Sequence, residues 1–284
     1  MLYLVLAALV WGSSFPVIQY TLRDVSPILF LILRFAVAFL ILLPRYRRVQ
    51  RVRTLFGRDL VLIGLLNMIA FMCQYKAQEL TTASKTALFI NSNPVFVAVF
   101  SVFLVKERFT KQQLAALVLA LSGVVITSTR LDFSGFAAVN TGDLFAILAG
   151  LLWAFFVIYS GGLAKKYGAF NMSQALCFWA ALGATPLLVP EDARFAWRAA
   201  PAVLYLAVVT TILAYFFFLK GVQSVSPLST SIVILVEVVV AFLISHFFLG
   251  ESFSRIETVG VVLVLAGVVM VVARRKDVTN SERR

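Results

Sequence analysis

The sequence predicts an all-α integral membrane protein with ten transmembrane helices arranged as a five-plus-five inverted repeat. The 284 residues are 61% hydrophobic and only 13% charged, with a mean hydropathy of +0.96. Ordinary soluble domains carry about 25% charged residues. The apolar residues form ten runs of a length that can cross a bilayer, which takes about 20 residues per helix. The last five runs repeat the pattern of the first five.

The boundaries of the ten helices follow from the apolar runs and the polar links between them. Helices suit lipid because they satisfy their own backbone hydrogen bonds. The first run lacks a basic leader region and a small-residue cleavage site, so we expect it to be retained as a helix. The expected spans are 2–21, 27–44, 59–79, 82–104, 110–128, 142–163, 172–190, 200–221, 226–248 and 254–273.

The basic residues indicate how the chain is oriented in the membrane. The net charge of +12 does not point to nucleic acid, because Lys and Arg concentrate in short links between apolar runs. The link 45–58 alone carries six arginines. With that link in the cytoplasm, the links and tail on its side carry 16 Lys and Arg, and those on the other side carry five. The positive-inside rule then predicts a multi-pass protein of the cytoplasmic membrane, with both termini and the basic tail 274–284 in the cytoplasm.

The sequence lacks the residues that several kinds of chemistry require. The two cysteines, Cys73 and Cys177, both fall inside apolar runs and form no disulfide framework or metal-ligand spacing. No glycine-rich phosphate loop is present, so no ATP-driven step is expected. With one histidine and two cysteines, the sequence predicts no metal site, no catalytic residues and no cofactor.

The internal repeat is visible without gaps. Residues 101–125 overlay residues 245–269 at an offset of 144, and residues 6–11 overlay residues 148–153 at an offset of 142. The chain therefore divides into a first repeat, 1–130, and a second repeat, 142–273. Since five helices is an odd number, the second repeat is inverted relative to the first. Inverted repeats are typical of secondary transporters, with the substrate site near the bilayer midplane between the halves.

A polar residue occurs in the middle of one helix of each half. Eight of the nine residues from 232 to 240 are aliphatic, and the ninth is Glu237. At an offset of 144, Glu237 pairs with Asn93, and both lie eleven residues into their spans. A charge at this depth costs about 2.5–3.5 kcal/mol unless it faces protein or water. Because desolvation favours a protonated carboxyl group, Glu237 is a candidate proton carrier. The alternative is a structural hydrogen bond to a neighbouring helix.

Two basic residues lie inside or at the edge of spans. Arg34 is permanently charged and could attract an anion on the transport pathway. Alternatively, it anchors its helix by pairing with backbone carbonyls or with Asp24. Lys85 opens the fourth span and either faces the cavity or extends toward the membrane surface.

The third span carries a polar stripe. Asn67, Phe71, Gln74 and Gln78 recur at intervals of four, three and four, which places them on one helix face. Such a face points away from lipid, either into a cavity or into hydrogen bonds with other helices. The repeat mates of this stripe include Tyr215.

Two tryptophans, Trp11 and Trp153, are repeat mates and lie within their helices instead of near the membrane surface, where Trp usually gathers. They either close a cavity around a substrate or pack in the interior. Together the candidate substrate-binding residues are Trp11, Arg34, Gln74, Lys85, Asn93, Trp153, Tyr215 and Glu237.

The sequence resembles the drug/metabolite transporter superfamily, specifically its EamA-type permeases. The segments that carry the resemblance are "WGSSFP" (11–16), "SPILFLILRF" (26–35), "NPVFVAVFSVFLVKERFT" (93–110) and "EVVVAFLISHFFLGESFS" (237–254). The resemblance implies ten helices in two inverted halves, with a central cavity that moves amino acids, other metabolites or drugs, usually outward. Members often carry Lys near position 19 and Pro after the glutamate, where this chain has Gln19 and Val238.

These observations favour a secondary transporter that exports amino acids or related small polar metabolites by alternating access around a midplane cavity. Its expected partners are a small-molecule substrate, the lipid bilayer and protons as the coupling ion. The alternatives are an uncoupled facilitator or channel-like permease, a multidrug exporter and, remotely, an intramembrane enzyme. An enzyme is the least favoured because Glu237 is the one acidic residue near the midplane.

Overall fold

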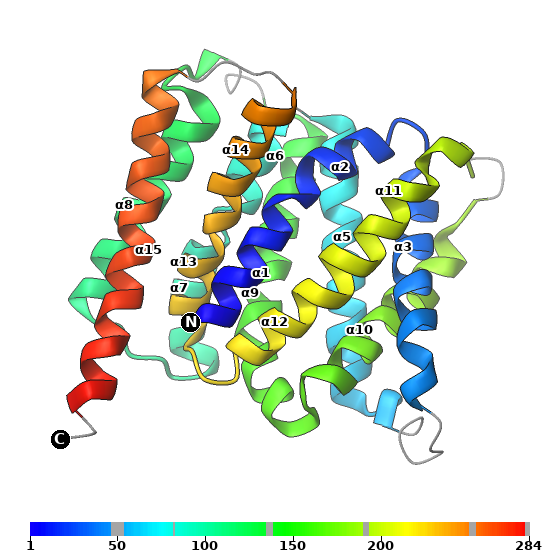
Figure 1. The fold of residues 1–284 in the computed structure, drawn as a ribbon, viewed down its shortest axis with the longest axis horizontal. Coiled ribbons are helices and arrows are strands. Elements are labelled where there is room, and N and C mark those ends of the chain that lie inside the picture. Colours follow the sequence, from blue (N-terminus) through cyan, green and yellow to red (C-terminus); the bar gives the residue numbers. More distant parts are fainter. Residues whose placement is uncertain (47–53, 82, 135–138, 190–192, 250–253, 282–284) are drawn as a thin grey trace.

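The computed structural model describes residues 1–46, 54–81, 83–134, 139–189, 193–249 and 254–281. These residues form helices packed side by side and no strand, apart from an isolated antiparallel bridge between Val25 and Phe195 (Figure 1). The all-α prediction is confirmed. Part of the predicted basic link, residues 47–53, and the end of the basic tail, residues 282–284, lie outside the described residues.

The elements follow one another along the chain in two halves. The first half contains α1 (Leu2–Gly12), α2 (Ser14–Thr21), α3 (Pro27–Leu42), η1 (Leu43–Tyr46), α5 (Arg58–Leu80), α6 (Ala83–Ile90), α7 (Asn93–Leu104) and α8 (Lys111–Thr129). The second half contains α9 (Thr141–Tyr167), α10 (Ala169–Ala184), η3 (Thr185–Leu187), η5 (Trp197–Ala199), α11 (Ala200–Tyr205), the π-helical η6 (Leu206–Leu213), α12 (Ala214–Gly221), α13 (Pro227–Ile234), α14 (Val236–Leu249) and α15 (Arg255–Ser281).

These elements account for the ten predicted spans. Within the described ranges, eight helical segments are long and apolar enough to cross a membrane. The remaining two, α3 and α10, have 16 residues each. The predicted span 172–190 is displaced relative to α10, which begins directly after Gly168 and ends at Ala184. Gly168 has a positive φ of 80°, and Pro186 follows shortly after the end, so backbone chemistry sets both boundaries.

Three membrane-crossing segments are interrupted near their middle, between α1 and α2, between α6 and α7, and between α13 and α14. Pro94 lies in the first turn of α7 and cannot donate to the preceding helix. Side chains at this break bond the carbonyls instead, with Asn91 Nδ2 donating to Ala87 O and Asn93 Nδ2 donating to Ile90 O. At the offset of 144, the α6/α7 break coincides with the α13/α14 break at Leu235. The two repeats thus break at the same point.

The packing of the helices follows the two-fold repeat. The pairs α8 with α15, α7 with α13, and α3 with α10 each join an element to its repeat mate or to the mate's segment. In addition, α9 packs against α5, α6 and α7, while its counterpart α1 packs against α12, α13 and α14. Each half therefore supplies one central helix that packs against the other half. A cavity shared by both halves is expected between these two central helices.

The contact between α8 and α15 depends on glycine. A Cβ atom on Gly123 would lie 2.5 Å from Gly260 O, and one on Gly260 would lie 2.8 Å from Gly123 O and also meet Thr127. Both distances are too short for a real contact, so the backbones approach as closely as glycine permits. Small residues at helix crossings allow van der Waals packing in lipid, where no hydrophobic effect drives helices together.

Gly260→Ala should therefore destabilise the protein, whereas Gly162→Ala should not. The added methyl group overpacks the α8–α15 crossing, a change that usually costs about 1–3 kcal/mol. Gly162 lies in a helix of the same bundle, but a Cβ there would meet nothing within 4 Å. The midpoint of thermal unfolding in detergent is the measurement. Equal midpoints for the two variants would contradict the proposed close contact.

Candidate functional site

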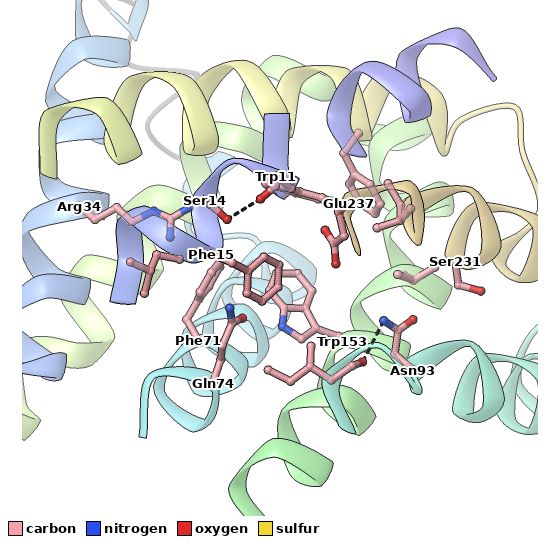
Figure 2. A pocket seen from close by; sticks show the side chains of 15 residues that line it. Trp11, Ser14, Phe15, Arg34, Phe71, Gln74, Asn93, Trp153, Ser231 and Glu237 are labelled. Atoms are coloured by element: carbon pink, nitrogen blue, oxygen red, sulfur yellow. Dashed lines mark hydrogen bonds between the residues drawn. The ribbon is translucent and has the colours of Figure 1, made fainter. Parts of the chain in front are cut away.

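A buried cavity lies where the interrupted helices meet the central helices. Figure 2 shows side chains from both halves directed into it. The space that water centres can occupy in it is about 60 Å³, and one water molecule needs roughly 10–15 Å³ on this measure. The cavity is therefore narrow but has room for several water molecules. Its lining residues are Trp11, Ser14, Phe15, Ile18, Arg34, Phe71, Gln74, Ile90, Asn93, Trp153, Val157, Phe218, Ser231, Ile234 and Glu237.

Glu237 contributes an unpartnered carboxylate to this cavity. The residue is 8% exposed and lies in the first turn of α14, directly after the break at Leu235. Its carboxylate points into the cavity in Figure 2. Among the described residues it has no hydrogen-bond or ion-pair partner. The alternative role considered from the sequence, a structural hydrogen bond to a neighbouring helix, therefore has no partner in the described part of the chain.

Asn93, the repeat mate of Glu237, adds a second acceptor. Its Nδ2 donates to Ile90 O at 3.2 Å, which stabilises the end of α6. Its Oδ1 is buried and accepts no hydrogen bond. Both interrupted helices thus bring a polar side chain to the cavity, and the carboxyl group of Glu237 favours a ligand that carries N–H groups or positive charge.

Arg34 contributes positive charge to the same cavity. The side chain is 2% exposed. Nε donates to Thr211 Oγ1 at 2.8 Å, Nη1 to Tyr75 Oη at 2.7 Å, and Nη2 to Thr210 Oγ1 at 3.0 Å. The guanidinium also lies 5.0 Å from the centre of the Phe71 ring. All of these partners are neutral, and no described carboxylate forms an ion pair with Arg34.

Asp24, the anionic partner considered for Arg34 from the sequence, pairs with Arg198 instead. The hydrogen bond from Arg198 lowers the pKa of the Asp24 carboxyl, so this pair stays charged at neutral pH. The pair joins the link after α2 to η5, next to the bridge between Val25 and Phe195. Asp24 therefore serves a contact between links, and Arg34 is held by hydroxyl groups.

The π-helix η6 accounts for the arrangement around Arg34. Its wide turn lets Thr210 O accept from Trp11 Nε1 at 3.0 Å and from Arg34 Nη2 at 3.4 Å. Both threonine hydroxyls in turn donate to Leu206 O. Single π turns are rare and frequently occur at functional sites. No pattern in the sequence indicates this turn, because its composition is that of an ordinary apolar helix.

Aromatic side chains from both halves form one wall. The Trp11 and Trp153 rings lie 6.3 Å apart, and Phe71 meets Trp153 edge-on at 5.0 Å. Phe15 and Phe218 also line the cavity but were not predicted. Because 26 phenylalanines occur in the chain, residue type alone could not single these two out. The tryptophan pair was identifiable because the two residues are repeat mates.

In the polar stripe of α5, some residues line the cavity and one forms a hydrogen bond with another helix. Gln74 and Phe71 line the cavity. Asn67 Oδ1 accepts from Tyr215 Oη at 2.6 Å, a hydrogen bond between α5 and α12. Tyr215 is buried and does not line the cavity, contrary to the prediction. Its hydroxyl is bonded to Asn67 in a neighbouring helix instead.

Lys85 also lies outside the cavity, contrary to its placement among the candidate residues. Its Nζ forms an ion pair with Asp143 Oδ2 at 3.0 Å, and both side chains are buried. The remaining six predicted residues, from four segments of the first half and two of the second, do line the cavity: Trp11, Arg34, Gln74, Asn93, Trp153 and Glu237. Ser14 and Ser231 line it as well and were missed, since isolated serines are common in membrane helices.

Comparison with known proteins shows the family of the chain that forms this cavity. The model of the EamA-like transporter family matches residues 1–129 and 140–273. The chain belongs to the EamA-like transporter family. The match covers both halves and thus all the elements that line the cavity, so the resemblance to EamA-type permeases is confirmed.

Individual relatives of this EamA-like protein agree with that assignment. An uncharacterized transporter of Archaeoglobus fulgidus is 26% identical, over 96% of this chain and 97% of its own length. The uncharacterized transporter YwfM of Bacillus subtilis is also 26% identical, and the match covers 98% of this chain and 95% of YwfM. A solved crystal structure matches with a TM-score of 0.80 at 19% identity, over 96% of this chain and 97% of that one, which shows the fold alone.

Proposed function

We propose that this EamA-like protein is a secondary transporter that exports amino acids or related small polar metabolites through the cavity between its halves. The observation that carries the proposal is a guanidinium and an ionisable carboxyl group, Arg34 and Glu237, which line one cavity and have no charged partner among the described residues. Figure 2 shows them approaching the cavity from different sides.

A zwitterion complements this arrangement. A buried charge is costly unless it is paired, and each of these residues lacks the counter-charge that the other carries. A substrate carboxylate would pair with Arg34, whose guanidinium binds carboxylates well, while a substrate ammonium group would pair with Glu237. Trp11 and Trp153 would then cover the remainder of the molecule.

The coupling ion in this proposal is the proton, carried by Glu237. The carboxyl group is unpartnered and faces a cavity that has room for water, so it can exchange a proton with the side to which the cavity opens. The interrupted helices α6/α7 and α13/α14 carry Asn93 and Glu237 at their breaks, where a change of helix direction would move both groups together. Such discontinuous helices are typical of substrate and ion sites in secondary transporters.

The orientation we propose has both termini on the cytoplasmic side of the cytoplasmic membrane. The 16-to-5 distribution of Lys and Arg supports it. In this orientation, the ion pair of Asp24 with Arg198 lies outside the cell and the one of Asp59 with Lys166 lies inside.

A multidrug exporter is the second candidate, because aromatic side chains make up much of the cavity wall. The narrow space weighs against a bulky ligand in this conformation. An uncoupled facilitator would use the same cavity without a proton, and an intramembrane enzyme would need more than the one acidic residue that lines it.

The proposal is tested with purified protein in liposomes. We expect uptake of radiolabelled amino acids above that of protein-free liposomes, with further accumulation when a pH gradient is imposed. Lipophilic cations should compete weakly, because the cavity is narrow and also contains Arg34. Tight binding of lipophilic cations together with no uptake of any amino acid would contradict the proposal, and uptake that ignores the gradient would favour the facilitator.

A further inference from the structure

The buried ion pair of Lys85 with Asp143 joins the two halves outside the cavity. The two side chains are 7% and 2% exposed, and Lys85 Nζ lies 3.0 Å from Asp143 Oδ2. Thr81 Oγ1 donates to Asp143 Oδ1 at 2.6 Å. The carboxylate thus binds the end of α5 and the start of α6, both in the first half, while it belongs to α9 in the second half.

Asp143 is held rigidly on its own helix. It is the third residue of α9 and forms a capping box with Asn140, because Asn140 N donates to Asp143 Oδ2 at 3.1 Å and Asp143 N donates to Asn140 Oδ1 at 3.0 Å. Its carboxylate therefore cannot follow α6 if α6 moves away. Separating α6 from α9 breaks the ion pair.

The helix α6 runs from this ion pair to the cavity. A Cβ atom on Gly142 would lie 2.8 Å from Thr81 N, and one on Gly150 would lie 2.8 Å from Phe89 O. The end of α5 and the last turn of α6 thus lie directly against the backbone of α9. The helix α6 ends at Ile90, which lines the cavity, next to the α6/α7 break. As a result, α6 covers the cavity on the side of the ion pair.

At the opposite end of the bundle, the described residues hold the start of α13 by hydrogen bonds and not by an ion pair. At the offset of 144, the repeat mate of Lys85 is Ser229 in α13. Ser229 Oγ accepts from Gln113 Nε2 at 3.0 Å, and the neighbouring Leu228 N donates to Glu107 Oε2 at 3.3 Å. The position equivalent to Lys85 is therefore neutral, and the contacts at the starts of α6 and α13 differ: a buried ion pair at one end and hydrogen bonds at the other.

We propose that Lys85, Asp143 and Thr81 form a lock that keeps the cavity closed on their side, so that the resting protein loads from the opposite side. The face of the bundle at which α5 ends and α9 begins is called the lock face. The inference rests on the proposed function for the role of the cavity as the transport site. In the proposed orientation the lock face is extracellular, and loading from the cytoplasm matches export.

Cysteine labelling tests the lock without any substrate. Phe15→Cys places a reporter in the cavity of a variant in which Cys73 and Cys177 are replaced by Ala. An impermeant thiol reagent is applied to intact cells and to inside-out vesicles. Exposed reference sites, Ser134→Cys at the lock face and Arg108→Cys at the opposite face, report which face each preparation presents.

We expect the reporter to react from the face opposite the lock. Lys85→Met combined with Asp143→Asn should raise its reaction rate from the lock face by about tenfold or more, because the closed state loses its ion pair without leaving a buried charge. Thr81→Val, a milder change, should raise that rate by a few fold. Lys76→Met is the control, since it removes the half-exposed pair with Glu79 near the same face and should change nothing.

Two results would overturn the lock. One is an unchanged rate from the lock face in both the double variant and Thr81→Val, with the variants folded as judged by size-exclusion chromatography. The other is an equal rise in Lys76→Met. Because the readout needs no transported molecule, a failure to find amino acid transport leaves this test intact, and the two proposals fail separately.

Discussion

Glu237→Gln should abolish transport driven by a pH gradient while leaving exchange of substrate between the two sides of the membrane. Glutamine keeps the size of the side chain but carries no titratable proton, so net coupling is lost. Exchange needs no net proton movement and should persist. Folding should survive, because the amide removes an unpartnered buried charge instead of creating one. The measurements are gradient-driven uptake and counterflow in liposomes.

Each outcome assigns a different role to Glu237. Loss of both driven transport and exchange indicates that the carboxylate binds a substrate cation directly. Gradient-driven flux at the level of the unmodified protein would end the proton-carrier hypothesis. Glu79→Gln is the matched control, because it makes the same chemical change at a half-exposed carboxylate that does not line the cavity, and its transport should match the unmodified protein.

Arg34→Lys should weaken transport of amino acids by about 10- to 100-fold in kcat/KM. The positive charge remains, but the lysine cannot reproduce the three hydrogen bonds to Tyr75, Thr210 and Thr211 while facing the cavity. Hydrogen bonds that involve a charged group contribute about 1.5–3 kcal/mol, which corresponds to this range. Initial rates in liposomes over a range of substrate concentrations are the measurement.

The ligand series decides what Arg34 recognises. If it binds the substrate carboxylate, Arg34→Lys should impair amino acids far more than the corresponding amines, which lack that group. Equal losses for both series would show that Arg34 only holds α3 against η6. Arg198→Lys is the control, since it alters an arginine that pairs with Asp24 in a link and does not line the cavity.

Polar residues at bilayer depth were the most informative part of the sequence for the site. Glu237 and Asn93 could be paired as repeat mates, and both line the cavity. Trp11 and Trp153 were identified in the same way. The physical reason is that hydrocarbon penalises polar groups strongly, so a polar residue in the middle of an apolar run must face protein or water.

The partners of the basic residues could not be predicted. Lys85 was a candidate for the cavity, yet it pairs with Asp143, 58 residues away in sequence and on the central helix of the other half. One hypothesis from the sequence paired Arg34 with Asp24. In the structure Arg34 instead binds threonine hydroxyl groups of a π-helix, and no sequence pattern predicts that helix. Charged side chains are long, and which partner they reach depends on the rotation and tilt of each helix.

Residue type and spacing were enough to predict ten membrane crossings, a repeat after five helices and a carboxyl group in the middle of an apolar run. These properties follow from transfer of each side chain between water and lipid, which depends on residue type and spacing alone. The structure was needed to show that Glu237 has no partner among the described residues, that Arg34 shares its cavity, and that an ion pair holds the start of α6 where hydrogen bonds hold the start of α13. Those properties depend on close packing between helices from both halves, where a glycine such as Gly150 sets which backbones can touch.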